Sequence, residues 1–187
     1  MQRFSLVHWV AVLALIAFYA VPIGLAIAGA RREKRQGRGL GPGFKGWLFL
    51  FVWGLWVGFI AYAFSMLGYY WGPDVGVAFG VIPGVMIVES AQNLLLGVAL
   101  VVLLWLAMGK SRHFRWGWVA LVLVAVVNYP LNLLMVVAAL NRQDIAFDPF
   151  AEQGLGDLAR WLGTVLFMAV WTVYVFRSRR VALTFTR

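Results

Sequence analysis

The sequence contains no cysteine, few charged residues and still fewer acidic ones. The absence of cysteine excludes disulfide bonds, thiolate metal sites and a cysteine nucleophile. Only 12% of the residues are charged and 63% are hydrophobic, whereas soluble domains average about 25% charged and about 45–50% apolar residues. A water-soluble core could not bury so much apolar surface, so the composition predicts an integral membrane protein.

Motifs of catalysis are also lacking. The sequence has no phosphate-binding loop, dinucleotide fingerprint, serine-hydrolase elbow or zinc-protease pattern, and no spacing typical of a metal site. We therefore expect no cofactor and no metal, and the pattern favours a protein that is not an enzyme. The net charge of +9 would suggest a nucleic-acid partner in a soluble protein. Here the basic residues stand in short clusters between apolar runs, so no nucleic acid is expected.

What the chain does contain is five long apolar runs, at residues 6–30, 47–71, 85–108, 116–140 and 158–176. Each is long enough to cross about 30 Å of hydrocarbon as a helix. Strict alternation, which a membrane β-barrel would need, is absent. The sequence predicts an all-α fold, a polytopic bundle of five transmembrane helices. The Gly- and Pro-rich segment 72–84 is expected to be a loop at the membrane interface.

Basic residues set the predicted orientation. Segments 31–46, 109–116 and 177–187 would share one side, and they hold thirteen of the sixteen Lys and Arg residues. Cytoplasmic loops carry such an excess. The C-terminus is therefore expected in the cytoplasm, and an odd number of spans places the N-terminus outside. A cleaved signal peptide ending near Ala30 is the alternative, but run 6–30 is longer than usual for one and a basic cluster follows it directly.

Polar residues inside the runs are candidate functional residues, because they are costly in hydrocarbon. Glu89 and Asn93 are four residues apart and share a helix face, as do Asn128 and Asn132. These four residues could form a polar seam between the third and fourth helices, beside Pro130. Interhelical hydrogen bonding is the structural alternative. Ser90, Gln92, and the i,i+3 pair Asp157 and Arg160 are the other polar residues of this kind.

Two basic clusters end the first and last runs. We expect them to anchor the helices at anionic lipid headgroups or the cytoplasmic surface; their members are Arg31, Arg32, Arg35, Arg177, Arg179 and Arg180. After the second cluster, the apolar tail 181–185 could lie in the interface or dock under the bundle.

Residues 46–187 resemble a bacterial membrane family, domain of unknown function family 2569. The resemblance rests on four places: Gly46-Trp47-Leu48, the pair Glu89 and Asn93, the basic loop 110–114, and the ending Trp171, Tyr174, Ser178, Arg179, Arg180, Val181, Thr184 and Phe185. It implies a four-helix membrane domain at 46–187, preceded at 1–45 by an added transmembrane helix and a basic cytoplasmic loop. It also implies a bacterial cytoplasmic (inner) membrane, but no activity, because the family is uncharacterised.

Three hypotheses for function remain. The first is a non-enzymatic accessory or scaffold subunit that acts through contacts in the bilayer, with a membrane-protein partner or as a homo-oligomer. The second is a small transporter or channel-like protein that uses the polar seam. The third is an enzyme on lipid-linked substrates that uses Glu89 with Asp144 and Asp148.

Overall fold

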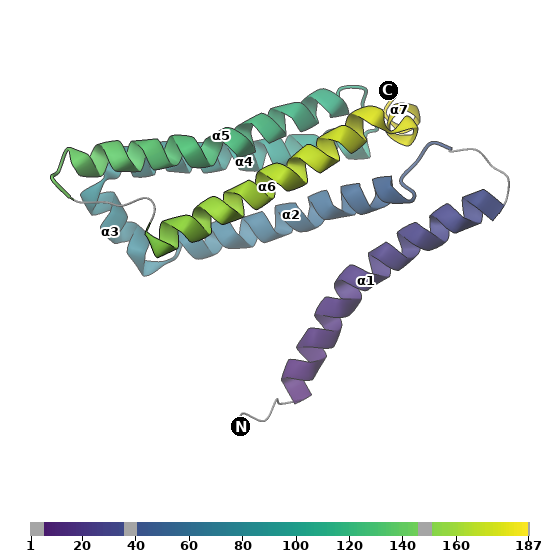
Figure 1. Ribbon diagram of the computed structural model, residues 1–187, viewed down its shortest axis with the longest axis horizontal. Helices are drawn as coiled ribbons and strands as arrows, with labels where there is room; N and C mark the ends of the chain where they lie inside the picture. The colour runs from purple at the N-terminus through teal and green to yellow at the C-terminus, as the bar shows by residue number, and fades with distance from the viewer. Residues whose placement is uncertain (1–5, 36–40, 146–150, 187) are drawn as a thin grey trace.

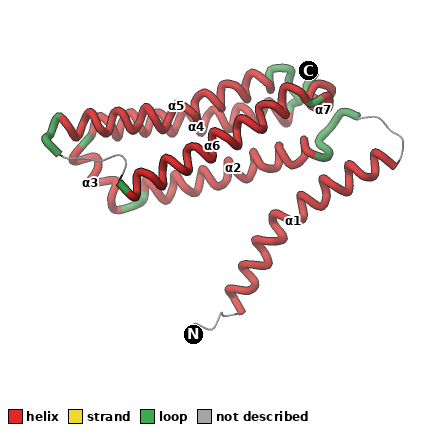
Figure 2. The backbone as a smooth tube through the Cα atoms, viewed as in Figure 1, coloured by secondary structure: helices red, strands yellow, loops and turns green. Residues whose placement is uncertain are grey.

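The structure, a computed structural model, describes residues 6–35, 41–145 and 151–186. Every regular element in these ranges is a helix. In Figure 1 the long helices run side by side, except for α1, which leaves the others at an angle. The same view coloured by secondary structure sets the helices, in red, apart from the described loops, in green (Figure 2). In chain order the helices are α1 (Leu6–Arg35), α2 (Trp47–Tyr70), α3 (Pro73–Val81), α4 (Pro83–Met108), α5 (Phe114–Asn141), α6 (Glu152–Arg177) and α7 (Arg179–Thr184).

Four of these helices are long and apolar enough to cross a membrane: α2, α4, α5 and α6. Lipid offers no hydrogen bonds, so an apolar segment must pair its own backbone groups, and a helix does this locally. The all-α membrane fold predicted from the sequence is confirmed to this extent. A crossing by α1 and the orientation of the bundle stay predictions.

The prediction of an interfacial loop at residues 72–84 is wrong in part, because residues 73–81 form the short helix α3. Pro73 begins this helix and Pro83 begins α4, and proline is favoured there because a first-turn N–H has no helical partner in any case. Asp74 lies in the first turn of α3, where its charge suits the helix dipole. The glycines of this segment did not prevent the helix.

The best-packed core lies at one end of the bundle, where α2 and α5 begin and α4 and α6 end. Phe51 is at its centre, with its ring centroid 4.9 Å from that of Trp118 and 4.8 Å from that of Trp171. The indole N–H of Trp118 donates to the Thr172 hydroxyl at 2.9 Å. The buried members of this core are Leu48, Phe51, Val52, Leu55, Leu103, Leu104, Ala107, Phe114, Trp118, Leu121, Val175, Val181 and Phe185.

The C-terminal tail docks under this core, which decides between the two alternatives left by the sequence. The Ser178 hydroxyl accepts from the Val181 N–H and begins α7. Val181 is fully buried, and the ring of Phe185 stacks on that of Phe114 at 4.0 Å. The tail therefore closes the bundle rather than lying along the membrane surface.

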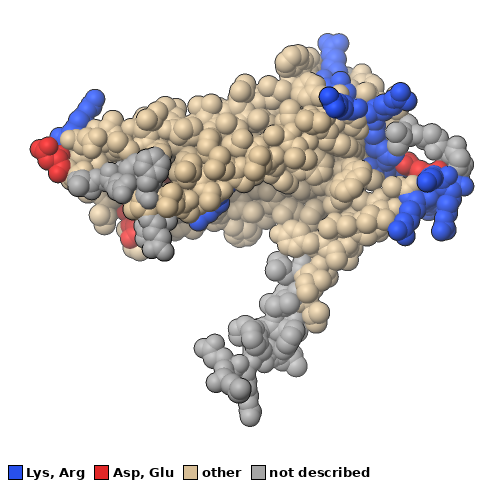
Figure 3. All heavy atoms as spheres, viewed as in Figure 1, with Lys and Arg blue, Asp and Glu red and all other residues tan. Residues whose placement is uncertain are grey.

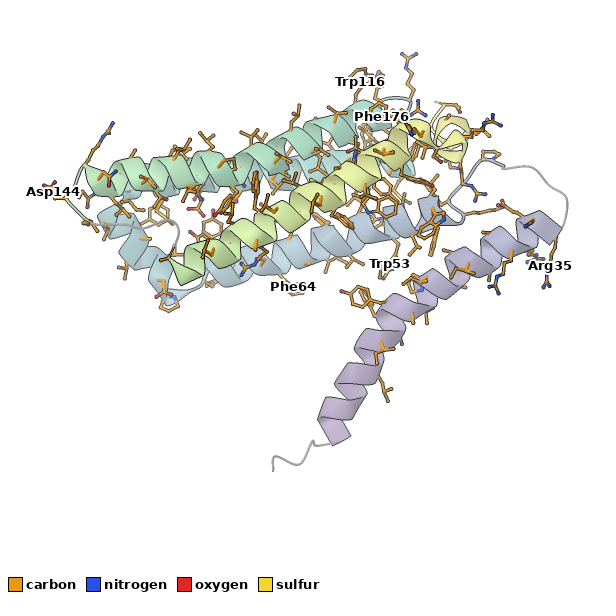
Figure 4. All side chains as sticks on the ribbon, in the orientation of Figure 1. Arg35, Trp53, Phe64, Trp116, Asp144 and Phe176 are labelled. Atoms are coloured by element: carbon orange, nitrogen blue, oxygen red, sulfur yellow. The ribbon has the colours of Figure 1, made fainter. Side chains whose placement is uncertain are left out.

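Helix α1 contains Pro22 and packs on the bundle over only part of its length. Phe18 meets Trp53 of α2 with ring centroids 5.0 Å apart, and Trp53 projects from α2 toward α1 (Figure 4). From there toward its N-terminus, α1 diverges from the bundle (Figure 1).

In the view of Figure 3, most charged side chains gather at the two ends of the molecule, and the visible long side between them is largely uncharged. We call the end with α7 the basic end and the opposite end, with Asp144, the acidic end. Arg35 and Asp144 mark these two ends in Figure 4. The long helices α2, α4, α5 and α6 alternate in direction along the chain. The basic segments precede α2, lie between α4 and α5, and follow α6. Two long helices separate each basic segment from the next, so all three segments are at the same end.

Candidate functional site

Two neighbouring helices, α2 and α4, share a polar cluster near the acidic end. The Tyr62 hydroxyl donates to the main-chain carbonyl of Asn93, and the Asn93 side-chain amide donates to the Tyr70 hydroxyl at 3.4 Å. The Tyr69 hydroxyl is beside the carboxyl group of Glu89. Glu89 and Asn93 thus have their described contacts with α2, whereas the sequence-based interpretation set them against α5.

The neighbouring residue Gln92 is on a different side of α4, because one residue turns a helix by about 100°. Two contacts give the register between α4 and α5. Gln143 donates to the Val81 carbonyl at 2.8 Å, and a Cβ at Gly117 would meet Leu106. In this antiparallel register Gln92 is level with Asn132.

The nitrogen and oxygen of the Gln92 amide and the side-chain oxygen of Asn132 are buried and have no hydrogen-bond partner among the residues that the structure describes. Such groups are costly in an apolar interior unless they pair with each other, with water or with a solute. Asn128, one turn away on α5, is half-buried. A polar seam between α4 and α5 stays a prediction, with Gln92 in place of Glu89 and Asn93 as its residue on α4.

Tyr62, Tyr69 and Tyr70 are the members of this region that the sequence did not single out. Tyrosine is common at membrane interfaces, so its presence near the end of an apolar run gives no signal of a site. Tyr62 and Tyr70 contact Asn93, and Tyr69 is beside Glu89. This pairing depends on the packing of α2 against α4, which the local sequence does not specify.

A groove of about 520 Å³ runs along α2 and α4 beside the polar cluster. Apolar side chains make up most of its wall, and its polar members are Tyr62, Tyr70, Ser90 and Asn93. Its remaining lining residues are Phe59, Met66, Leu94, Gly97, Val98, Val101 and Val102. Small-molecule sites are commonly of this size and composition, mainly apolar with a few placed polar groups.

A second polar cluster joins three parts of the chain at the basic end. Glu33, beyond the apolar run 6–30, accepts from the Arg180 guanidinium of α7 and is 3.7 Å from the Lys45 ammonium. The hydrogen bond from Arg180 lowers the pKa of Glu33 below its ordinary value of 4.5, the charges of Arg180 and Lys45 act in the same direction, and partial burial opposes them. The Gly43 N–H donates to the Thr184 hydroxyl at 2.9 Å.

Arg180 therefore differs from the other basic residues expected to contact lipid headgroups. Its side chain is only 7% exposed and pairs with Glu33, so it is not available to a headgroup. The physical reason is the docking of α7, which turns residue 180 under the bundle. Arg31, Arg32, Arg35, Arg177 and Arg179 are exposed at this end, and headgroup contact stays a prediction for them.

The remaining polar residues are near the acidic end. Arg160 bridges Asp157 at 3.1 Å, as the i,i+3 spacing predicted, and both side chains are largely exposed. Asp144 is exposed in the loop after α5, with a positive φ of 57°. Asp148 lies outside the described residues. Within the described ranges, no group of three His, Asp or Glu residues could hold a metal ion.

Comparison with known protein families, with curated proteins and with solved structures finds no match. The similarity of residues 46–187 to domain of unknown function family 2569 stays a prediction. The site is thus defined by its own geometry, which is that of an apolar bundle with two polar clusters and a lateral groove.

Proposed function

We propose that the chain is a five-span protein of a bacterial cytoplasmic membrane, with its N-terminus outside and its basic end in the cytoplasm. The gathering of basic side chains at one end of four apolar helices supports this orientation (Figure 3). The resemblance of residues 46–187 to a bacterial membrane family, which is a prediction from the sequence, is the reason for this choice of membrane.

Single cysteines test this topology, because the natural chain has none. Arg112 and Arg142 are exposed in the loops at the two ends of α5, which makes them a matched pair. A membrane-impermeant maleimide added to intact cells should label Arg142→Cys and Gln2→Cys but not Arg112→Cys. Labelling of Arg112→Cys alone would show that the orientation is the reverse of the one proposed. Labelling of Arg142→Cys without labelling of Gln2→Cys would show that α1 does not cross the membrane.

We further propose that the protein is a non-enzymatic accessory or scaffold subunit that binds a partner helix in the bilayer. The observation that carries this proposal is an exposed line of small residues on α2: Gly54, Gly58, Ala61, Ser65 and Gly68. Their spacing of four, three, four and three residues keeps them on one helix face. Small residues of this kind allow close approach of two helices in a membrane.

This face of α2 is uncovered in the structure. A Cβ placed at Gly54, Gly58 or Gly68 would meet no atom of the described part of the chain within 4 Å. Its neighbour α1 contacts α2 at Trp53 and then diverges (Figure 1), and Leu13 and Ile16 of α1 are exposed as well. Two apolar helices joined at one end and apart at the other present a space suited to a third helix.

Purification in mild detergent tests the accessory function. The parent protein is expected to recover a stoichiometric membrane partner, and Gly58→Ile should lose it because the larger side chain prevents close approach. Gly163→Ile on α6 is the matched control, since a Cβ there also meets nothing within 4 Å. Recovery of the protein alone, or equal recovery by both variants, would count against this function.

Transport by the seam between α4 and α5 is a second candidate. It is favoured by the buried Gln92 amide and the Asn132 side-chain oxygen, which have no hydrogen-bond partner within the described ranges. A solute or proton could use these groups as binding partners inside the bundle. Proton or ion flux into liposomes that is abolished by Asn132→Leu would support it. Liposomes no leakier than protein-free controls would argue against it.

A further inference from the structure

The groove between α2 and α4 lies where a packed core would be expected to continue. On α2, the buried residues Leu48, Phe51, Val52 and Leu55 share a helix face with the groove residues Phe59, Tyr62 and Met66. On α4, the groove residues Ser90, Asn93 and Gly97 continue the line between buried Met86 and buried Leu104. The floor of the groove therefore follows the inward-facing lines of the two helices, whereas its rim, with Leu94 and Val98, belongs to their exposed faces.

Protein interiors seldom leave such gaps, because their packing density approaches that of organic crystals. A space of about 520 Å³ along an inward-facing line is far larger than a water molecule, whose share of liquid volume is about 30 Å³. Its walls are mostly apolar, so water would be a poor occupant. An apolar ligand or a hydrocarbon chain fits its chemistry.

The shape of the groove favours one extended chain. Its residues on α4 run from Ser90 to Val102, and those on α2 run from Phe59 to Tyr70. At 1.5 Å per residue these stretches are about 17–18 Å long. This length is close to one leaflet of the hydrocarbon core, about 15 Å.

The groove is polar at one end and apolar at the other, as a lipid is polar near its headgroup and apolar along its chains. Tyr70, Ser90 and Asn93 are at its acidic-end mouth, and Phe59, Val101 and Val102 are at the mid-membrane end. The Tyr70 hydroxyl accepts from Asn93 and keeps its own proton to donate. No lining residue is charged, so the bound part of the ligand carries hydrogen-bond acceptors rather than a phosphate.

We propose that the groove holds one acyl chain of a phospholipid from the leaflet at the acidic end, with the ester carbonyl at Tyr70 and Asn93. Access is lateral, since Leu94, Val98 and Val101 on the rim are exposed to the bilayer. This binding is independent of the partner helix proposed above, because the small residues of α2 lie on a different face.

Native mass spectrometry of the purified full chain tests this site. The parent protein should retain one phospholipid per chain. Val98→Trp fills the groove and should lower lipid occupancy about tenfold, the effect of losing contacts to about two methylene groups. Tyr70→Phe should lower it about threefold, the effect of one neutral hydrogen bond.

Val127→Trp on α5 is the matched control. Val127 is 51% exposed and Val98 is 50% exposed, so the two substitutions disturb lipid-facing positions equally. Delipidated protein gives a second measurement: added phosphatidylethanolamine should raise the unfolding temperature of the parent and of Val127→Trp, and not that of Val98→Trp. Equal lipid retention by both Trp variants would overturn the proposal, as would a parent protein that retains no phospholipid. Crosslinking of a photoreactive residue placed at position 98 to protein instead of lipid would also overturn it.

Discussion

The ion pair between Glu33 and Arg180 ties α1 to the C-terminal helix α7, and its removal gives the sharpest test of this fold. The two side chains are 14% and 7% exposed, so both are mostly shielded from water. Nη1 of Arg180 is buried and has no partner among the described residues. Glu33→Gln would therefore leave a buried guanidinium without its carboxylate.

The expected magnitude follows from that burial. Removing one partner of a buried ion pair costs about 3–5 kcal/mol, because the remaining charge is desolvated and uncompensated. Glu33 lies beside water at the basic end, so we expect the lower limit, about 3 kcal/mol, which is about a 100-fold change in an equilibrium. When α7 undocks, Arg180 reaches water and no longer needs the carboxylate. Glu33→Gln should therefore destabilise the docked state of α7 relative to the undocked state.

A buried cysteine can measure this undocking. Val181 is 0% exposed and next to Arg180. The natural chain has no cysteine, so Val181→Cys would introduce a single thiol. In a Val181→Cys background, Glu33→Gln should raise the rate of maleimide labelling about 100-fold. Adding Arg180→Met should restore slow labelling, because a pair replaced by apolar groups leaves no buried charge.

Asp157→Asn is the control for loss of a carboxylate. That residue pairs with Arg160 at the acidic end, where both side chains are largely exposed, and such pairs contribute about 0–1 kcal/mol. It should leave the labelling rate of Val181→Cys unchanged. A rate for Glu33→Gln within about twofold of the parent would refute the role of the ion pair, since the expected change is about 100-fold.

Three further predictions concern stability in detergent. The pKa of Glu33 in the folded state is lowered from 4.5. The stability that its ionised carboxylate contributes is therefore fully present above pH 4.5 and is lost as the pH falls below that value. The unfolding temperatures of the parent and of Glu33→Gln should converge when the pH is lowered from about 7. Thr172→Val leaves the buried indole N–H of Trp118 without an acceptor and should lower the free energy of unfolding by about 1–3 kcal/mol in chemical denaturation, whereas Thr172→Ser should not. Gly117→Val should cost about 1–3 kcal/mol in the same assay, because even its Cβ would be 2.8 Å from Leu106; an unchanged midpoint would show that α4 and α5 move apart freely.

The sequence was sufficient for the long helices. Runs such as 116–140 are apolar beyond anything a soluble core needs, and the structure has a helix at each of the five runs. It was insufficient for residues 73–81, where glycines suggested a loop and two prolines at helix starts permitted α3. Composition describes average tendencies, whereas a short helix depends on which residue occupies its first turn.

For the candidate site, the sequence identified polar residues but not their partners. Glu89 and Asn93 were recognised from their cost in hydrocarbon, yet their neighbours on α2 are tyrosines that resemble ordinary interfacial aromatics. Arg180 looked like its neighbours Arg177 and Arg179 until the docking of α7 placed it beside Glu33, 147 residues earlier in the chain.

By itself, the sequence determined that this is a helical membrane protein and which residues are costly in hydrocarbon, because hydrophobicity and helical hydrogen bonding are local properties. The tertiary structure decided which helix each polar side chain faces, that Arg180 is buried, and that a groove remains between α2 and α4. Those features depend on the rotation and register of helices about their axes. They are set by the packing of side chains across helices, which no single segment of sequence specifies.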